Sequence, residues 1–208
     1  MLEPSPDCPL CPRLQLFREE QRAWHPDWFN APVPSFGDAD ARLLIVGLAP
    51  GLKGANRTGR PFTGDYAGDL LYRTLLKFGI AEGTYAADPA DGLRLRHCLI
   101  TNAVRCVPPE NKPSGIETRT CNAFLKSQIA HLPSLRAILV LGRVAHEASL
   151  RALGTRASRW TFAHGARHDI GEISLFDSYH CSRYNTNTGV LTTEMFEAVI
   201  GAASAFIR

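Results

Sequence analysis

Four short and almost wholly apolar runs alternate with amphipathic segments along the chain, and this alternation limits the fold more than any other feature. The runs cover residues 43–48, 98–104, 137–141 and 173–176. Apolar runs of this length are typical of strands buried on both faces. Strands that alternate with helices form a parallel sheet covered by helices on both sides. The sequence therefore predicts an α/β fold with three α/β/α layers.

The segments between these runs carry helical patterns. We expect helices over residues 13–24, 65–78, 114–132 and 142–153, and a last one that begins at Thr192 or Thr193. Ser114 and Glu117 have the spacing of a capping box. Residues 25–40 predict an irregular arm, and residues 80–92 and 178–191 predict loops. With no repeat and no linker, residues 1–208 are expected to form one domain.

Composition excludes several classes of protein. The net charge of +3 is compatible with nucleic acid but does not establish it. No apolar run approaches the roughly 18 residues of a membrane span. The first residues, MLEPSPDCPLCP, lack the basic and apolar regions of a secretory signal. We therefore expect an intracellular, cytoplasmic protein that has no membrane partner. Monomeric state and association with the nucleoid are further expectations that composition does not establish.

Four of the six cysteines suggest a metal site. Cys8 and Cys11 form a CxxC pair, and Cys106 and Cys121 lie in or beside polar loop sequence. Stable disulfides are rare in a reducing cytosol, where CxxC spacing indicates metal or redox use. Four thiolates fit a tetrahedral zinc ion or a [4Fe-4S] cluster, and spacing alone leaves both open, as well as ordinary buried cysteines.

A glycine-rich stretch, GLAPGLKGANRTGRPFTGDYAGD, follows the first apolar run and covers residues 47–69. Glycine allows a ligand to approach the backbone closely. The stretch lacks both the GxxxxGK[ST] phosphate loop and the GxGxxG dinucleotide fingerprint. Ligands of open α/β sheets bind at the carboxyl ends of strands, where this stretch lies. We expect a binding site here, although a plain surface loop is the alternative.

Three loops leave the carboxyl ends of predicted strands and should converge on one edge of the sheet. They bring together Phe62, Asp65, Asn102, His180 and Asn185. Phe62 can stack on a ring, Asn102 can pair with an amide-like edge, and His180 can stabilise charge on an oxygen. Asp65 can orient a water molecule or stabilise a cationic sugar. Each residue also has a structural alternative, such as an N-cap role for Asp65.

Three segments carry a resemblance to a known family: GLAPGLKGANRTGRPFTGD, ITNAVRCVPPENKP and SYHCSRYNTNTGVLT. Together they resemble the iron–sulfur uracil-DNA glycosylases known as family 5. The resemblance implies the uracil-DNA glycosylase fold, a three-layer α/β/α sandwich with a central four-stranded parallel sheet. It also implies that an N-terminal arm binds a structural [4Fe-4S] cluster through Cys8, Cys11, Cys106 and Cys121.

The resemblance further implies a DNA repair reaction. Uracil flipped out of DNA would stack on Phe62 and be read by Asn102, while Asp65 and His180 act as catalytic residues. The water-derived hydroxyl would replace the base and leave an abasic site, with no lyase step. Substrate contacts are also expected from Gly47, Ala49, Gly51 and Asn185. DNA contacts are expected from Lys53, Arg57, Arg60, Arg143, Arg183 and Tyr184.

Two departures from the wider family bear on these expectations. Residues 47–51, GLAPG, carry no polar side chain to position water, which fits a role for Asp65 and predicts a permissive pocket that also accepts hypoxanthine. Cys181 stands where the last family motif commonly has Pro or Val. Two other functions stay open: a non-catalytic iron–sulfur protein that binds nucleic acid, and a hydrolase of free nucleosides.

Overall fold

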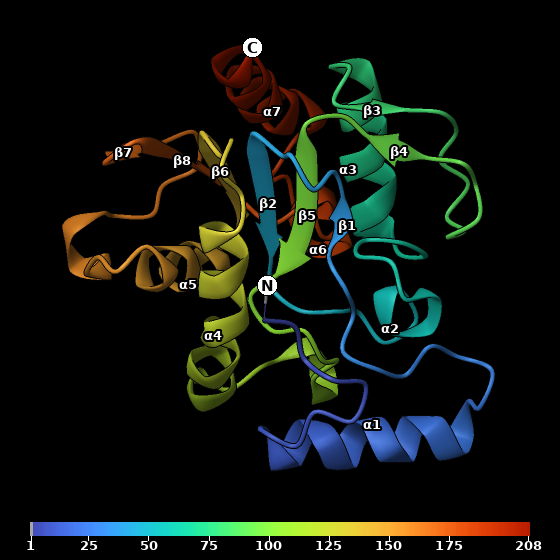
Figure 1. The fold of residues 1–208 in the computed structure, drawn as a ribbon. Coiled ribbons are helices and arrows are strands. Elements are labelled where there is room, and N and C mark those ends of the chain that lie inside the picture. Colours follow the sequence, from blue (N-terminus) through green and yellow to red (C-terminus); the bar gives the residue numbers. More distant parts are fainter. Residues whose placement is uncertain (1) are drawn as a thin grey trace.

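The structure is a computed structural model that describes residues 2–208, and a six-stranded sheet forms its centre (Figure 1). The strands stand in the order β1-β5-β2-β6-β8-β7. Their bounds are β1 (Phe36–Gly37), β2 (Leu43–Gly47), β5 (Cys98–Asn102), β6 (Ala137–Leu141), β7 (Arg167–Ile170) and β8 (Ile173–Ser178). A separate hairpin pairs β3 (Ala81–Glu82) with β4 (Arg94–Leu95).

The four inner strands are parallel, as the sequence predicts. In register, Leu43 pairs with Cys98 on one side and with Ala137 on the other. Strand β8 continues the parallel sheet beside β6, with Ala137 opposite Ser174. The antiparallel edge strands β1 and β7 were not predicted. β1 has only two residues and β7 reads Arg-His-Asp-Ile, so neither shows an apolar run.

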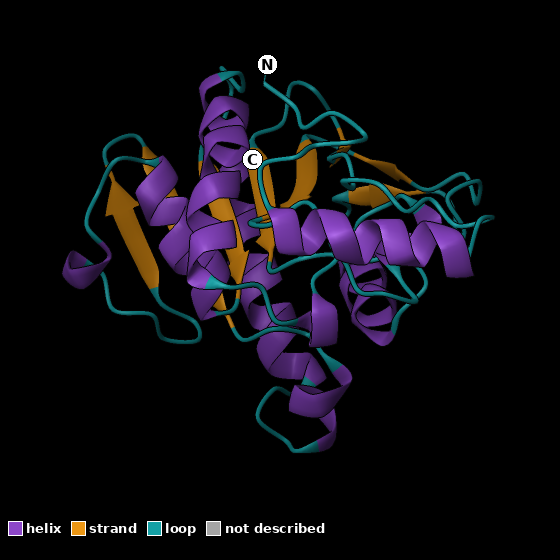
Figure 2. Cartoon of the chain, turned by 90° about the horizontal axis from the view of Figure 1, so that it is seen from below, coloured by secondary structure: helices purple, strands orange, loops and turns teal. Residues whose placement is uncertain are grey.

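Helices cover both faces of the sheet (Figure 2). They are α1 (Pro12–Trp24), α2 (Ala55–Thr58), α3 (Tyr66–Lys77), α4 (Gly115–Ala130), α5 (Arg143–Ala152), α6 (Arg183–Asn187) and α7 (Thr193–Ile207), with 3-10 turns η1 (Pro109–Asn111) and η2 (Ala157–Arg159). None of the helices described is both long and apolar enough to cross a lipid bilayer.

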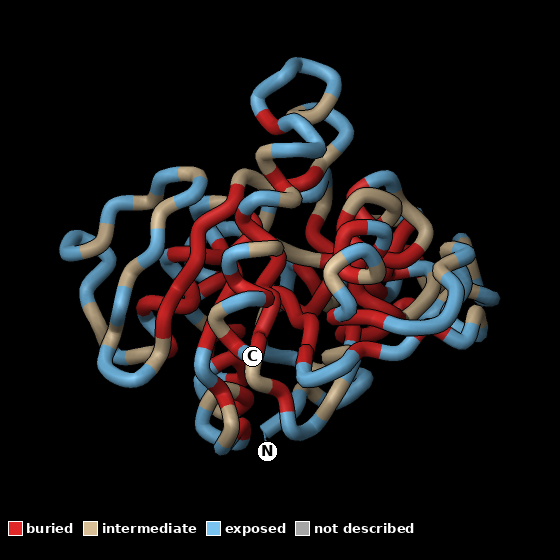
Figure 3. Tube along the Cα trace, turned by 90° about the horizontal axis from the view of Figure 1, so that it is seen from above, coloured by how far each residue is buried: buried red, intermediate tan, exposed pale blue. Residues whose placement is uncertain are grey.

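Alternate residues of the strands divide the core into two layers. Leu43 and Ile45 of β2 pack in the cluster that includes residues of α3 and α7. Leu44 and Val46 point the other way, into the cluster that includes residues of α4 and α5. Because side chains of a strand alternate between faces, one apolar run supplies both layers. The buried segments accordingly lie in the middle of the molecule (Figure 3).

The helix starts follow the capping signals of the sequence. Asp65 caps α3 by accepting a hydrogen bond from Gly68 N at 3.1 Å. Ser114 and Glu117 form the predicted capping box at α4. Thr192 caps α7. The short helices α2 and α6 lie inside segments that we expected to be loops, since four or five polar residues show no apolar periodicity.

The N-terminal arm joins the core near the carboxyl ends of the inner strands. Helix α1 crosses below the ends of β2 and β5 in Figure 1, on the side opposite the C-terminus. Leu14 of α1 packs with Val104 and Phe124 in a small third cluster that also holds Cys106 and Cys121. The arm is thus attached to the two segments that follow β5.

Candidate active site

A cavity of about 600 Å³ opens at the carboxyl ends of the parallel strands. It is formed by the loops that follow β2, β5 and β8. Its lining residues are Leu48, Ala49, Pro50, Gly51, Ala55, Phe62, Gly64, Asp65, Tyr66, Ala67, Asn102, Asn111, His180, Ser182 and Arg183. The structure therefore brings together Phe62, Asp65, Asn102 and His180, which the sequence placed on three separate loops.

Asp65 is fixed at the start of α3. Its Oδ1 accepts the hydrogen bond from Gly68 N, while Oδ2 points toward Gly51 and Gly54, whose lack of side chains makes room for the carboxylate. Burial raises the pKa of Asp65, and the backbone N–H groups of Gly68 and Ala67 oppose this rise. The Asp65 carboxylate therefore caps α3 through Oδ1, as predicted, and Oδ2 is left for a role in the cavity.

Phe62 and Asn102 meet across Gly47, at the floor of the cavity. A β-carbon on Gly47 would lie 2.5 Å from Phe62 Cζ and would overlap Asn102 Oδ1. Phe62 has a backbone φ of 53°, which is unusual for an aromatic residue and costs about 1–3 kcal/mol. Asn102 Oδ1 is buried and has no hydrogen-bond partner within the described chain. Such an orphaned acceptor suits a ligand that brings a donor.

His180 lies opposite Phe62, with 6.1 Å between the ring centroids. Although one side of the residue borders the cavity, the protein atoms packed around the ring lower the pKa of His180 to about 4. No carboxylate among the described residues offsets this effect. The imidazole is therefore neutral near pH 7 and can donate one hydrogen bond.

Three residues with polar side chains line the cavity but were not predicted as site residues: Tyr66, Asn111 and Ser182. Asn111 comes from the segment between Cys106 and Cys121, where Glu110 and Asn111 have φ values of 54° and 56°. Asparagine adopts this left-handed conformation more readily than most residues, and the flanking prolines favour a tight turn. These signals could have predicted the turn, but not that the turn brings Asn111 to the cavity.

Asn185 does not line the cavity in this structure. Its Nδ2 donates to the carbonyl oxygen of His180 at 2.8 Å, while its backbone N–H is accepted by Ser182 Oγ at 3.4 Å. Asn185 thus holds the backbone of the segment that carries His180. The substrate contact predicted for Asn185 stays a prediction.

Five of the six predicted DNA contacts are exposed, namely Lys53, Arg57, Arg143, Arg183 and Tyr184, and Arg183 also lines the cavity. Arg183 lies over the ring of Tyr66 at 5.4 Å, and Tyr184 is 74% exposed. Their position is compatible with a nucleic-acid surface, and their contacts stay predictions.

The prediction for Arg60 is wrong, because this side chain is buried. Its guanidinium forms a two-pronged ion pair with Asp91, with hydrogen bonds of 2.8 and 2.7 Å, and faces the rings of Phe36, Tyr72 and Tyr85. This pair holds the pKa of Asp91 well below its usual range. With 4% of its surface exposed, Arg60 cannot reach a phosphate. It stabilises the loop instead.

The four predicted metal ligands, Cys8, Cys11, Cys106 and Cys121, line one separate cavity beneath α1. Burial raises the pKa of Cys11 to about 11 and that of Cys121 to about 12, so thiolates here require compensating positive charge. Hydrogen bonds to sulfur come from the Arg18 guanidinium, 3.5 Å from Cys106 Sγ, and from the backbone N–H of Arg105, 3.3 Å from Cys121 Sγ.

The spacing of these sulfurs differs from that of the ligands of one zinc ion. Four sulfurs around one zinc would lie about 3.8 Å apart, given Zn–S bonds of about 2.3 Å. The described residues contain one group of three metal-ligating atoms within 4.8 Å of one another, and no cysteine belongs to it. The four thiols therefore do not have the close spacing that a single zinc ion requires.

The chain is similar in sequence to proteins of one known superfamily. The family model for the uracil DNA glycosylase superfamily matches residues 34–203. A type-5 uracil-DNA glycosylase of Thermus thermophilus is 48% identical over 200 residues, covering 93% of this chain and 90% of the relative. Similar proteins of the same description come from Pyrobaculum aerophilum, at 37% identity over 96% of this chain and 88% of the relative, and from Mycobacterium tuberculosis, at 41% over 94% and 76%.

Proposed function

The chain belongs to the uracil-DNA glycosylase superfamily, and from this membership we propose that it hydrolyses the N-glycosidic bond of uracil in DNA and leaves an abasic site. The observation that carries the proposal is the convergence of Phe62, Asp65, Asn102 and His180 on one cavity. A stacking face, an unpartnered amide, a carboxylate and a neutral imidazole are the groups that excision of a flat, uncharged base requires.

The reaction begins with extrusion of the nucleotide, because the glycosidic bond is not accessible inside a stacked duplex. Extrusion costs a few kcal/mol and is cheapest at a mismatch, which favours U·G pairs. The flipped base stacks on Phe62. Asn102 Oδ1, which lacks a partner in the free protein, accepts the base N3–H.

Bond cleavage then separates charge. The sugar becomes cationic, and the Asp65 carboxylate stabilises it and orients the attacking water. The departing base carries negative charge on O2, which accepts a hydrogen bond from neutral His180. No lysine is among the described cavity residues, so the enzyme is monofunctional.

We also propose that Cys8, Cys11, Cys106 and Cys121 hold a [4Fe-4S] cluster. The cluster has a structural role, in which it ties the N-terminal arm to the segment between β5 and α4. The Arg18 guanidinium, which bonds Cys106 Sγ, and the charge of the nearby Arg105 guanidinium supply part of the positive charge that buried thiolates need.

The substrate range is proposed to include hypoxanthine and other deaminated bases. Ala49, Pro50 and Gly51 line the cavity without a polar side chain that would select one ring, and about 600 Å³ leaves room for a bicyclic base. Absence of hypoxanthine release from inosine-containing DNA at high enzyme concentration would exclude this extension. We further propose that the enzyme acts as a monomer.

The test is excision from a labelled duplex with one U·G pair, read by alkaline cleavage under single-turnover conditions. Wild type should cleave, Asp65→Asn should lose several orders of magnitude, and Asp27→Asn, an exposed control, should match wild type. Uracil release from free deoxyuridine would instead support a nucleoside hydrolase. DNA binding without cleavage by the cluster-loaded protein would support the non-catalytic alternative.

A further inference from the structure

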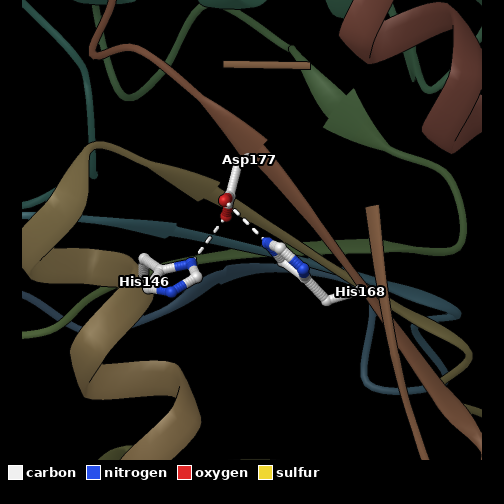
Figure 4. A group of neighbouring side chains, drawn as sticks. All are labelled: His146, His168 and Asp177. Carbon is white, nitrogen blue, oxygen red and sulfur yellow. Dashed lines mark hydrogen bonds and ion pairs between the residues drawn. The ribbon is translucent and has the colours of Figure 1, made fainter. Parts of the chain in front are cut away.

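A second group of chemically competent side chains lies away from the cavity (Figure 4). His146 of α5, His168 of β7 and Asp177 of β8 place one ligand atom each within 4.8 Å of the others. His146 Nδ1 is 2.7 Å from Asp177 Oδ1, and His168 Nε2 is 3.0 Å from Asp177 Oδ2. The proposed reaction uses none of these residues.

The group is buried and closed in by aromatic rings. Asp177 is fully buried, and His146 is 1% exposed. Phe162 contacts the His146 ring edge-on at 5.6 Å, and Trp160 contacts the His168 ring at 5.7 Å. Only the His168 side chain, 13% exposed, borders solvent. A buried carboxylate needs a positive partner, so the surroundings favour a cation at this position.

The hydrogen bonds of His146 indicate between which two atoms that cation lies. Nε2 faces the carbonyl oxygen of Trp160 at 2.9 Å, and a carbonyl only accepts, so Nε2 carries the proton. In a neutral ring Nδ1 is then a lone pair directed at a carboxylate oxygen. Two acceptors at 2.7 Å repel each other unless a proton or a metal ion lies between them.

We propose that His146, His168 and Asp177 form a binding site for zinc or a similar first-row divalent cation. Two imidazoles and one carboxylate are a ligand set that such cations bind. The bond from His146 Nε2–H to a backbone carbonyl is the outer contact that orients metal-bound histidines. Binding displaces the proton between His146 and Asp177 to solvent, and His168 changes tautomer so that its proton leaves Nε2 and stands on Nδ1.

Little movement is needed to admit the ion. Two ligands of a tetrahedral zinc lie about 3.3 Å apart at bond lengths of about 2.0–2.1 Å, so the two hydrogen-bonded pairs would open by about 0.3–0.6 Å. His168 stands on the edge strand β7, next to solvent, and provides both the movement and the entry path. The ion would join α5, β7 and β8, and β8 leads directly to His180.

Zinc itself is the probe, with the full-length, cluster-loaded protein. After dialysis against zinc chloride, elemental analysis should find one equivalent of zinc per chain in addition to cluster iron. Zinc-edge X-ray absorption should show only nitrogen and oxygen ligands at about 2.0–2.1 Å, whereas binding to the cysteines would show sulfur at about 2.3 Å. The absorption measurement needs no variant and stands alone if a variant fails to fold.

His168→Gln should weaken zinc binding by at least about tenfold and abolish the zinc-dependent rise in melting temperature. His131→Gln, which alters an exposed imidazole on the end of α4, should bind zinc as wild type does. No retained zinc, sulfur ligation, or equal retention by His168→Gln would each overturn the proposal, and the group would then be a proton-bridged ion pair.

Discussion

The carboxylate of Asp65 rests against the α-carbon of Gly54, so closely that a β-carbon at position 54 would overlap Oδ2. The two residues are separated by ten positions of the glycine-rich loop, and this contact determines where the carboxylate points. Position 54 therefore requires glycine, because a side chain there would displace the Asp65 carboxylate.

We therefore expect Gly54→Ala to impair catalysis. A displacement of Asp65 by about 1 Å should reduce the single-turnover rate by about 10- to 100-fold. Gly115→Ala is the control, since its β-carbon would meet only the end of the flexible Arg119 side chain at 3.3 Å. A Gly54→Ala enzyme as fast as wild type would show that the position of Asp65 is not critical.

The rate should depend on the ionisation of Asp65. Burial raises the pKa of this carboxyl, and the carboxylate is the active form, so activity should fall as the pH drops through a pKa higher than that of an ordinary aspartate. The charge of Asp69 contributes to the raised pKa. Asp69→Asn should therefore move the acid limb of single-turnover rate against pH to lower pH. An unchanged limb in Asp69→Asn, as in the control Asp27→Asn, would argue that another group titrates.

His180 should act as a neutral donor. Because its pKa is lowered to about 4, protonation is complete only in strong acid, and the rate should stay level between about pH 6 and 8. A decline through about pH 6.5 with rising pH would indicate an imidazolium acid instead. His180→Ala should lose about 10²–10³-fold, and His180→Gln less, because its amide still donates.

Substitution of Asn102 should abolish activity without lowering the stability of the protein. Replacing it by leucine, which has a similar shape, removes a buried oxygen that has no partner among the described residues. Leaving such a group unpaired costs about 1–3 kcal/mol, so the melting temperature of Asn102→Leu should equal or exceed that of wild type while uracil excision is lost. Differential scanning fluorimetry and the excision assay measure the two effects. A large fall in melting temperature would mean that Asn102 holds the loop.

Substitution of Arg57 should affect DNA binding and substitution of Arg60 should affect stability, although the two residues stand three positions apart. Arg57→Gln should reduce the slope of log affinity against log salt by about one, as expected for loss of one phosphate contact. Arg60→Gln should leave that slope unchanged but destabilise the protein by about 3–5 kcal/mol, because it leaves Asp91 buried without its partner. Fluorescence anisotropy at several salt concentrations and thermal melts distinguish the two.

The layered fold could be predicted because each inner strand contains a short, almost wholly apolar run, and each long helix has an apolar face or a capping residue. The edge strand β7 could not, since its residues Arg167–Ile170 are exposed or half-buried and gain strand geometry only by pairing with β8. Local pattern carries no signal for a strand whose stability comes from its neighbour.

Some residues of the candidate site could likewise be predicted from the sequence, and others could not. Phe62, Asp65 and His180 lie in loops that follow predicted strands, and Asn102 lies near the end of another strand, so topology alone brings them to one edge of the sheet. The burial of Arg60 depends on Asp91, thirty-one positions away, and on three rings from other segments. Likewise, His146, His168 and Asp177 come from three elements, and no spacing in the sequence marks them as a group.

The segment between β5 and α4 contributes residues to two separate sites. Cys106 and Cys121 face the N-terminal arm, and Asn111 between them reaches the substrate cavity. An engineer who wished to replace the proposed cluster with another cross-link would therefore have to reproduce the backbone path of residues 107–114 as well. With the proposed cluster at this position, uracil repair in an organism would depend on iron supply and on cluster assembly.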